Sequence, residues 1–196
     1  MSEKTIAMIF PGQGSQAVGM GKALYEQRPE AREIFEQADE ILGRAISKLC
    51  FEGPEEDLKL TVNTQPALYT SSAAALTVLE AEGIKPSITA GHSLGEYTAL
   101  YSAGTLDFET GLKLVEKRGQ AMYEAGLARP GTMAALLNLD GDTVEDICKQ
   151  ASAKGTVVPA NWNSSAQIVV SGDPDACAEA VRLAQEAGYQ RSVTLP

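Results

Sequence analysis

Residues 90–97 read AGHSLGEY, and they predict a strand, a sharp turn and a helix in immediate succession. A strand-like run at residues 87–90 leads into a G-x-S-x-G pattern centred on Ser93, and a helix-compatible run at residues 96–101 follows. Such a turn exposes the serine hydroxyl, since glycines on both sides avoid Cβ clashes. The start of the helix directs N–H groups toward developing negative charge. The pattern favours a nucleophile over a glycine-rich turn with an ordinary surface serine.

Composition limits the classes of protein that fit this chain. The 196 residues are 44% hydrophobic and 21% charged, which is typical of a globular protein of one or two domains. A net charge of −10 argues against nonspecific nucleic-acid binding. We expect no membrane association, because no apolar run could span a bilayer and the N-terminus lacks a signal-peptide pattern.

The three cysteines are scattered and form no C-x-x-C pattern. Cys50, Cys148 and Cys177 are therefore expected to be reduced thiols rather than disulfides or metal ligands. This cysteine usage predicts a cytoplasmic location and no metal site.

The first part of the chain, residues 1–128, reads as mixed α/β with more helices than strands. Apolar residues recur at helical spacing in the segment that follows Pro29, and Asp107 is a plausible N-cap for a late helix. The expected elements are a strand at residues 5–10, a helix at 29–42, a helix from about Pro66 to Gly83, a strand at 87–90 and a helix from about Phe108. A sheet of two strands is only marginally stable, so this part has fewer strands than such a fold requires. Either the pattern does not reveal the other strands, or they belong to sequence outside this chain.

The second part, residues 129–196, shows a different rhythm. The expected elements are strands at 132–139, 156–160, 167–171 and 189–195, and helices at 142–153 and 174–187. A polar loop is expected to join the two middle strands. The order βαββαβ predicts a ferredoxin-like small domain.

Four motifs occur together in a specific order and spacing. They read FPGQGSQ at residues 10–16, TQPA at 64–67, GHSLGEY at 91–97 and RGQAM at 118–122. With these motifs the chain, from Ile6 to its last residue, closely resembles the malonyl-CoA:acyl carrier protein transacylases of bacterial fatty acid synthesis. It is also similar to the acyltransferase domains of polyketide synthases.

The resemblance implies a fold and a reaction. The fold is α/β, here a partial α/β-hydrolase-like large subdomain with an inserted ferredoxin-like small subdomain. The reaction is transfer of malonyl from coenzyme A, through an ester on Ser93, to the phosphopantetheine thiol of acyl carrier protein. Malonyl-CoA and acyl carrier protein are the implied partners, and no cofactor is implied. Malonyl and methylmalonyl both remain open as the acyl group.

The resemblance also assigns the oxyanion hole to the backbone N–H groups of Gln13 and Leu94. Gln13 follows a strand between two glycines, so its backbone can approach a ligand, and Leu94 directly follows the nucleophile. The alternative for the glycine-rich loop is a dinucleotide site. That alternative requires an acidic residue at the end of a second strand about twenty residues on, where this sequence predicts a helix.

Further site residues follow from the resemblance. Arg118 matches the arginine that binds the malonyl carboxylate, and on a helix it shares a mostly apolar face with Met122. Gln65 corresponds to a residue near the floor of the site. Asn163, with Gln167, lies in the loop of the insert that faces the cleft, where contact with the pantetheine arm and an ordinary polar hairpin are equally open.

The expected general base has no match in this sequence. His92 is the single histidine, and it precedes Ser93 at a turn where adjacent side chains diverge, so we expect it to pack beside the turn. In the family the base is a later histidine, after the last strand of the insert. We therefore expect this chain to be one piece of the enzyme that transfers malonyl slowly by itself, and a complementary C-terminal fragment is a further candidate partner.

Two other functions remain as alternatives. An esterase-type serine hydrolase shares the G-x-S-x-G pattern, although it needs no arginine for a substrate carboxylate. A catalytically inactive interaction module could be built on the same scaffold.

Overall fold

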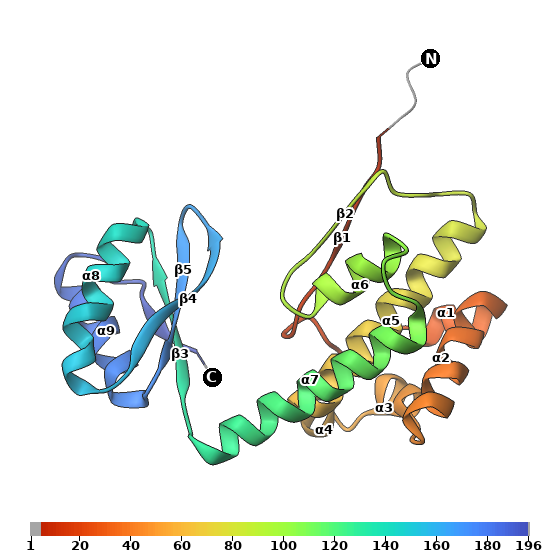
Figure 1. Ribbon diagram of the computed structural model, residues 1–196, viewed down its shortest axis with the longest axis horizontal. Coiled ribbons are helices and arrows are strands. Elements are labelled where there is room, and N and C mark those ends of the chain that lie inside the picture. The colour runs from red at the N-terminus through yellow and green to blue at the C-terminus, as the bar shows by residue number, and fades with distance from the viewer. Residues whose placement is uncertain (1–4, 196) are drawn as a thin grey trace. The chain divides into compact units, whose positions relative to one another are not determined.

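A computed structural model of the protein describes residues 5–195 and divides into two compact units, Met1–Glu124 and Ala125–Pro196 (Figure 1). The division falls within helix α7 (Phe108–Ala128). The sequence-based boundary, between residues 128 and 129, lies at the end of that helix and stays a prediction.

The first unit combines two strands with helices. Its elements are β1 (Ala7–Phe10), α1 (Lys22–Gln27), α2 (Pro29–Leu42), α3 (Ile46–Glu52), α4 (Glu55–Lys59), α5 (Thr61–Ala81), β2 (Ile88–Gly91), α6 (Gly95–Ser102) and the first part of α7. The helix expected from Pro29 to Leu42 is confirmed, as are the two early strands and the cap formed by Asp107, whose Oδ1 accepts a hydrogen bond from Thr110 N at 2.7 Å.

The two strands of this unit pair in parallel, with Phe10 opposite Gly91. Phe10 packs with Leu76 of α5 and Ala99 of α6 in a small cluster beside the sheet. The main core lies among α2, α3, α5 and α7, and its fully buried aromatic residues include Phe35 and Tyr69. This packing fixes the ends of β1 and β2 against the helices.

The expected start of the α5 helix near Pro66 is wrong, because the helix begins at Thr61 and contains Pro66 in its interior. A proline there lacks the N–H that would bind the carbonyl four residues earlier. That carbonyl belongs to Val62, and it accepts a hydrogen bond from Arg44 Nη2 at 3.1 Å instead. The arginine therefore satisfies the group that proline leaves unpaired.

The second unit is a four-stranded antiparallel sheet with strand order β4-β5-β3-β6. Its elements are β3 (Thr132–Leu137), α8 (Gly141–Ala151), the 3-10 helix η1 (Ser152–Lys154), β4 (Val157–Ser164), β5 (Gln167–Gly172), α9 (Pro174–Glu186) and β6 (Val193–Thr194). Helices α8 and α9 lie together on one side of this sheet, and their apolar faces form its core (Figure 1). The βαββαβ order and ferredoxin-like topology are confirmed.

The middle hairpin and the last strand differ most from the predicted bounds in this unit. The polar segment expected as a loop continues β4 to Ser164, because a two-residue turn at residues 165–166 already closes the hairpin with β5. The last strand contains only Val193 and Thr194. Tyr189, predicted as the start of that strand, belongs to the cap of α9, because its backbone N–H donates a hydrogen bond to Ala184 O. Gly188, the residue before Tyr189, has a φ of 101°.

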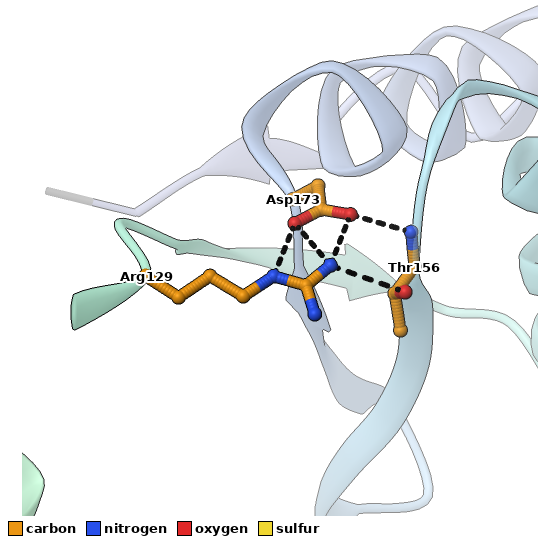
Figure 2. A network of polar contacts seen from close by, with 3 residues as sticks. All are labelled: Arg129, Thr156 and Asp173. Atoms are coloured by element: carbon orange, nitrogen blue, oxygen red, sulfur yellow. Dashed lines mark hydrogen bonds and ion pairs between the residues drawn. The ribbon is translucent and has the colours of Figure 1, made fainter. Parts of the chain in front are cut away.

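A polar network joins the beginning of β3 to the rest of the second unit (Figure 2). Arg129 donates from Nη2 to both carboxylate oxygens of Asp173, at 2.9 Å each, and from Nε to Oδ1 at 3.2 Å. Thr156 N donates to Asp173 Oδ2 at 2.7 Å. These bonds lower the pKa of Asp173, the hydrogen bond from Thr156 N being the larger cause and Arg129 the second.

None of the helices in the described range 5–195 is both long enough and apolar enough to cross a membrane.

Candidate active site

Two loops meet at one edge of the parallel strand pair. Because β1 and β2 run in the same direction, the residues that follow Phe10 and Gly91 emerge side by side. His92 N donates to Phe10 O at 3.1 Å. A Cβ atom on Gly12 would lie 2.6 Å from His92 O, so only glycine allows the first loop to pass this close. The loop containing Gln13 therefore lies directly against the turn that carries Ser93.

The turn after β2 has the geometry expected of a nucleophile elbow. Ser93 is exposed and has a φ of 53°, in the left-handed region that residues other than glycine rarely adopt. A Cβ atom on Gly91 would lie 2.0 Å from the carbonyl of Gly95, and one on Gly95 would lie 2.2 Å from Phe10 O. Each glycine of the pattern thus permits a backbone contact that holds the strained serine in place.

Helix α7 brings a cation to the serine. Arg118 Nη2 donates to Ser93 Oγ at 3.0 Å, and Nη1 donates to Gln65 Oε1 at 2.6 Å. The guanidinium carbon lies 5.9 Å from the centre of the Tyr97 ring. All three of these partners are neutral, and no carboxylate of residues 5–195 forms an ion pair with Arg118. A half-buried arginine without a carboxylate partner is suited to bind an anionic ligand.

Gln65 is fully buried beneath the arginine and uses both ends of its amide. Its Nε2 donates to Thr61 Oγ1 at 3.0 Å and approaches Met122 Sδ at 3.2 Å. Thr61 Oγ1 in turn donates to Gln13 Oε1 at 2.9 Å. A continuous series of hydrogen bonds therefore connects Arg118 to the loop after β1.

Close packing of two helices places the arginine. A Cβ atom on Gly119 would lie 2.9 Å from Thr61 O and 3.3 Å from Val62 Cα. The backbone of α7 thus passes directly over the first turn of α5, one residue after Arg118. Without a glycine here, the guanidinium would be held farther from Gln65.

The remaining predicted residues lie as follows. Leu94 has a buried side chain in the core and immediately precedes α6. His92 is exposed, and its Nδ1 lies 3.0 Å from where a Cβ atom of Gly12 would be. Met122 is 47% exposed.

Asn163 belongs to the second unit, in strand β4 rather than in the loop where the sequence placed it. Its Nδ2 donates to Gln167 Oε1 at 2.9 Å across the hairpin. The strand position follows from the short turn described above, and a contact of Asn163 with a pantetheine arm stays a prediction.

Sequence reasoning missed three residues of the site. Tyr97 and Gly119 lie inside quoted motifs, but their roles depend on the packing of α6 and α7. Thr61 lies four residues before Gln65 in the sequence. This spacing places two side chains next to each other only if both residues are in one helix, and the helix was predicted to start near Pro66.

The cysteines offer no competing nucleophile. All three are free and buried. Burial raises the pKa of the Cys50 thiol to about 12 and that of Cys148 to about 11, so both are protonated at neutral pH. Within the described range, no group of three or more histidine, cysteine, aspartate or glutamate residues is arranged to hold a metal ion.

Comparison with known proteins agrees with this geometry. Residues 7–195 match the family model described as acyl transferase domain. The chain belongs to this acyl transferase family. The fold class predicted from the sequence and the resemblance to malonyl-CoA:acyl carrier protein transacylases are therefore confirmed.

Individual relatives of the acyl transferase family show how far the similarity extends. The chain is 48% identical over 191 residues to the malonyl CoA-acyl carrier protein transacylase of Bacillus subtilis, covering 97% of this chain and 60% of the relative. A crystal structure of the corresponding protein from Clostridium perfringens has a TM-score of 0.93 and 42% identity, covering 98% of this chain and 61% of that one.

A third relative was solved together with a partner. It is a malonyl-transacylase in complex with its type II PKS acyl-carrier protein, with a TM-score of 0.90 and 39% identity over 98% of this chain and 62% of the other. The chain thus spans about three fifths of the length of these relatives. The expectation that it is one piece of a longer enzyme stays a prediction.

Proposed function

We propose that this site transfers a malonyl group from coenzyme A to the phosphopantetheine thiol of acyl carrier protein, with Ser93 carrying the acyl group as an ester. The observation that supports it is the 3.0 Å distance between Arg118 Nη2 and Ser93 Oγ. An acyl group bound to that oxygen places a carboxylate two carbons away within reach of the guanidinium. A hydrolase for neutral esters has no need of such a cation.

The transfer consists of two balanced substitutions. In the first, Ser93 Oγ forms a bond to the thioester carbonyl carbon, the C–S bond breaks, and coenzyme A leaves as a thiol with the proton lost from Oγ. In the second, the carrier thiol attacks the ester, the C–O bond breaks, and Oγ regains a proton. Splitting the transfer in this way replaces one difficult step with two easier ones.

The negative charge that develops on the carbonyl oxygen needs donors. We assign them to the backbone N–H groups of Gln13 and Leu94, which lie on the two loops that meet at the ends of β1 and β2. The loss of one such donor typically costs about 3 kcal/mol of transition-state stabilisation.

Malonyl recognition is assigned to Arg118, whose planar guanidinium can bind a carboxylate through two parallel hydrogen bonds. Gln65 orients the guanidinium, and Met122 lines the same face of α7. His92, next to the nucleophile, is a further proposed substrate contact, and contact of Asn163 with the pantetheine arm stays a prediction. The general base is not assigned to His92, because its ring lies against Gly12 of the loop that follows β1.

The partners follow from the same assignment. Malonyl-CoA is the donor and acyl carrier protein the acceptor, as the names of the relatives suggest. We also propose a cytoplasmic location, with which three free, buried thiols agree.

The test compares two acceptors for the acyl group. Malonyl-CoA is incubated with the protein, with and without phosphopantetheinylated acyl carrier protein, and both free malonate and malonyl-carrier are quantified. We expect malonyl-carrier as the main product and no product with Ser93→Ala. Free malonate in equal amounts with and without the carrier would instead identify a hydrolase.

A second experiment tests the arginine. Arg118→Ala should lose malonyl transfer by about 30-fold or more, in line with the roughly 2 kcal/mol or greater cost of removing one partner of a desolvated charge pair. Transfer of acetyl, which has no carboxylate, should change far less. An unchanged preference for malonyl over acetyl would refute the assignment of Arg118.

A further inference from the structure

We infer that Thr61 is a positioning residue that couples the carboxylate-binding arginine to the loop of Gln13. The inference rests on the proposed function and concerns a residue to which that function assigns no contact with substrate. Its hydroxyl is the link between two parts of the site that come from distant segments of the chain: α5 and α7 on one side, and the loop after β1 on the other.

The hydrogen bonds of this link run in one direction. A guanidinium can only donate, so Arg118 Nη1 requires the oxygen of the Gln65 amide, at 2.6 Å. The amide nitrogen of Gln65 must then face Thr61 and donate to its hydroxyl at 3.0 Å. The hydroxyl proton of Thr61 is left to bind Gln13 Oε1 at 2.9 Å. The charge of Arg118 thereby fixes the orientation of every group up to the loop.

Burial makes this orientation costly to change. Gln65 is 0% exposed, and a flipped amide would place its NH2 against the guanidinium and its oxygen against Met122 Sδ. Unpaired buried polar groups of this kind cost about 1–3 kcal/mol each. Hydrogen bonds in series also polarise one another where the local dielectric is low. Gln65 therefore holds a single orientation and presents a donor to Thr61.

Thr61 itself is held at a defined place. It is the first residue of α5, and its carbonyl oxygen lies 2.9 Å from the position of a Cβ atom on Gly119. The helix backbone thus fixes the Cα atom, and the β-branched side chain has few rotamers. A hydroxyl in this position can act as a rigid attachment point.

The loop that it holds needs such an attachment. Gln13 lies between Gly12 and Gly14, and Gly14 has a φ of 104°. The hydrogen bonds within the loop run from Gly14 N to Gln16 Oε1 at 2.8 Å and from Ser15 Oγ to Gly12 O at 2.7 Å, and neither involves Gln13. Because the flanking glycines permit many backbone conformations, these bonds leave Gln13 itself in need of a restraint. The hydrogen bond from Thr61 restrains the Gln13 side chain, and with it the backbone N–H that we assign to the oxyanion hole. Thr61 should therefore affect the rate of acyl transfer rather than the binding of coenzyme A.

The first test is a matched set of variants. Thr61→Val removes the hydroxyl at nearly constant shape, Thr61→Ser keeps it, and Thr77→Val removes a hydroxyl from the same helix, where it donates to Ala73 O within α5. Because complete loss of an oxyanion donor costs about 100- to 1,000-fold in kcat, we expect its mispositioning in Thr61→Val to cost about tenfold, with KM for malonyl-CoA nearly unchanged. Thr61→Ser and Thr77→Val should retain the kcat of the wild type.

Substrate dependence separates this role from that of the arginine. The loss in Thr61→Val should be equal for malonyl and acetyl, because the oxyanion forms with both. A kcat equal to that of the wild type would overturn the inference. A loss confined to the KM for malonyl-CoA would also overturn it, since Thr61 would then serve only Gln65 and Arg118.

The second test does not depend on activity. Amide hydrogen exchange of residues 12–16 should be faster in Thr61→Val than in the wild type, Thr61→Ser and Thr77→Val. If the wild type transfers no malonyl either alone or with the part of the Bacillus subtilis relative that the match does not cover, the proposed function fails. Hydrogen exchange then decides the role of Thr61 by itself. Equal exchange in all four proteins would overturn the inference that the Thr61 hydroxyl restrains the loop of Gln13.

Discussion

Gly119 offers a sharp test of how the site is built, because it lets α7 pass over the first turn of α5. In Gly119→Ala the new Cβ atom would lie 2.9 Å from Thr61 O, whereas ordinary contact begins at 3.4 Å. The two helices must therefore separate by about 0.5 Å at this point. Arg118 is the neighbouring residue, so its guanidinium should move away from Gln65 and Ser93 by a similar distance.

The expected magnitudes follow from this displacement. Overpacking costs about 1–3 kcal/mol, and the higher helix propensity of alanine returns about 1 kcal/mol, so the free energy of unfolding should fall by roughly 0–2 kcal/mol. A 1 Å misplacement can reduce the rate about 100-fold. Half that shift should lower malonyl transfer about tenfold, equivalent to about 1.4 kcal/mol. A loss of about 0–2 kcal/mol in the free energy of unfolding leaves most of the protein folded, so unfolding does not by itself explain a tenfold loss of malonyl transfer.

The assay measures kcat/KM for malonyl and acetyl transfer together with chemical denaturation. Gly126→Ala is the matched control, because Gly126 also lies in α7 and a Cβ atom there would meet nothing within 4 Å. The control should gain about 0.5–1 kcal/mol in stability with unchanged selectivity. If Gly119→Ala keeps the selectivity of the wild type, the close helix crossing does not position Arg118 and the reasoning fails.

Three further predictions concern the elbow, the core and the second unit. Gly91→Ala would place a Cβ atom 2.0 Å from the carbonyl of Gly95, so acylation of Ser93 should fall at least about 100-fold; wild-type acylation in this variant would show that the turn relaxes freely. Phe35→Ala removes a fully buried ring and should lower the free energy of unfolding by about 3–5 kcal/mol in denaturant titrations, and a loss under 1 kcal/mol would contradict its full burial in the core. The pKa of Asp173 is lowered below its ordinary value of 3.8. The ionised carboxylate therefore stabilises the folded state above that pH, and this stabilisation is lost as the pH falls through the lowered folded-state pKa. Asp173→Asn should make the free energy of unfolding less dependent on pH below about 4, and an unchanged pH profile would speak against the network.

The parts of the fold that follow from local patterns were predictable from the sequence. Helix α2 shows an apolar face, a proline in its first turn and a closing glycine, and its bounds were predicted correctly. The Schellman-type cap after Gly188 was not recognised, so the last strand was predicted too long. The interior proline of α5 was misread, because its unpaired carbonyl is satisfied by Arg44, which is distant in sequence.

The candidate site also contains residues that local sequence predicts and residues that only distant contacts reveal. Ser93 was predictable, because the glycines of the G-x-S-x-G pattern that marks its elbow lie within two positions of it. Gln65 and Arg118 entered only through the resemblance, since their contact joins α5 to α7 over 53 positions of sequence. Thr61 was missed for a related reason, because its hydroxyl acquires meaning only when the loop of Gln13 lies beside it. Contacts across such separations are set by packing, which a single sequence does not reveal.

The most direct test of the central claim is the mass of the protein after exposure to malonyl-CoA, with the modified residue located by peptide fragmentation. The protein is measured alone and with the part of the Bacillus subtilis relative that the match does not cover, alongside Ser93→Ala. We predict a single malonyl group on Ser93 in the combined preparation, and none in the variant. Absence of any adduct in both preparations, or an adduct on another residue, would contradict the account.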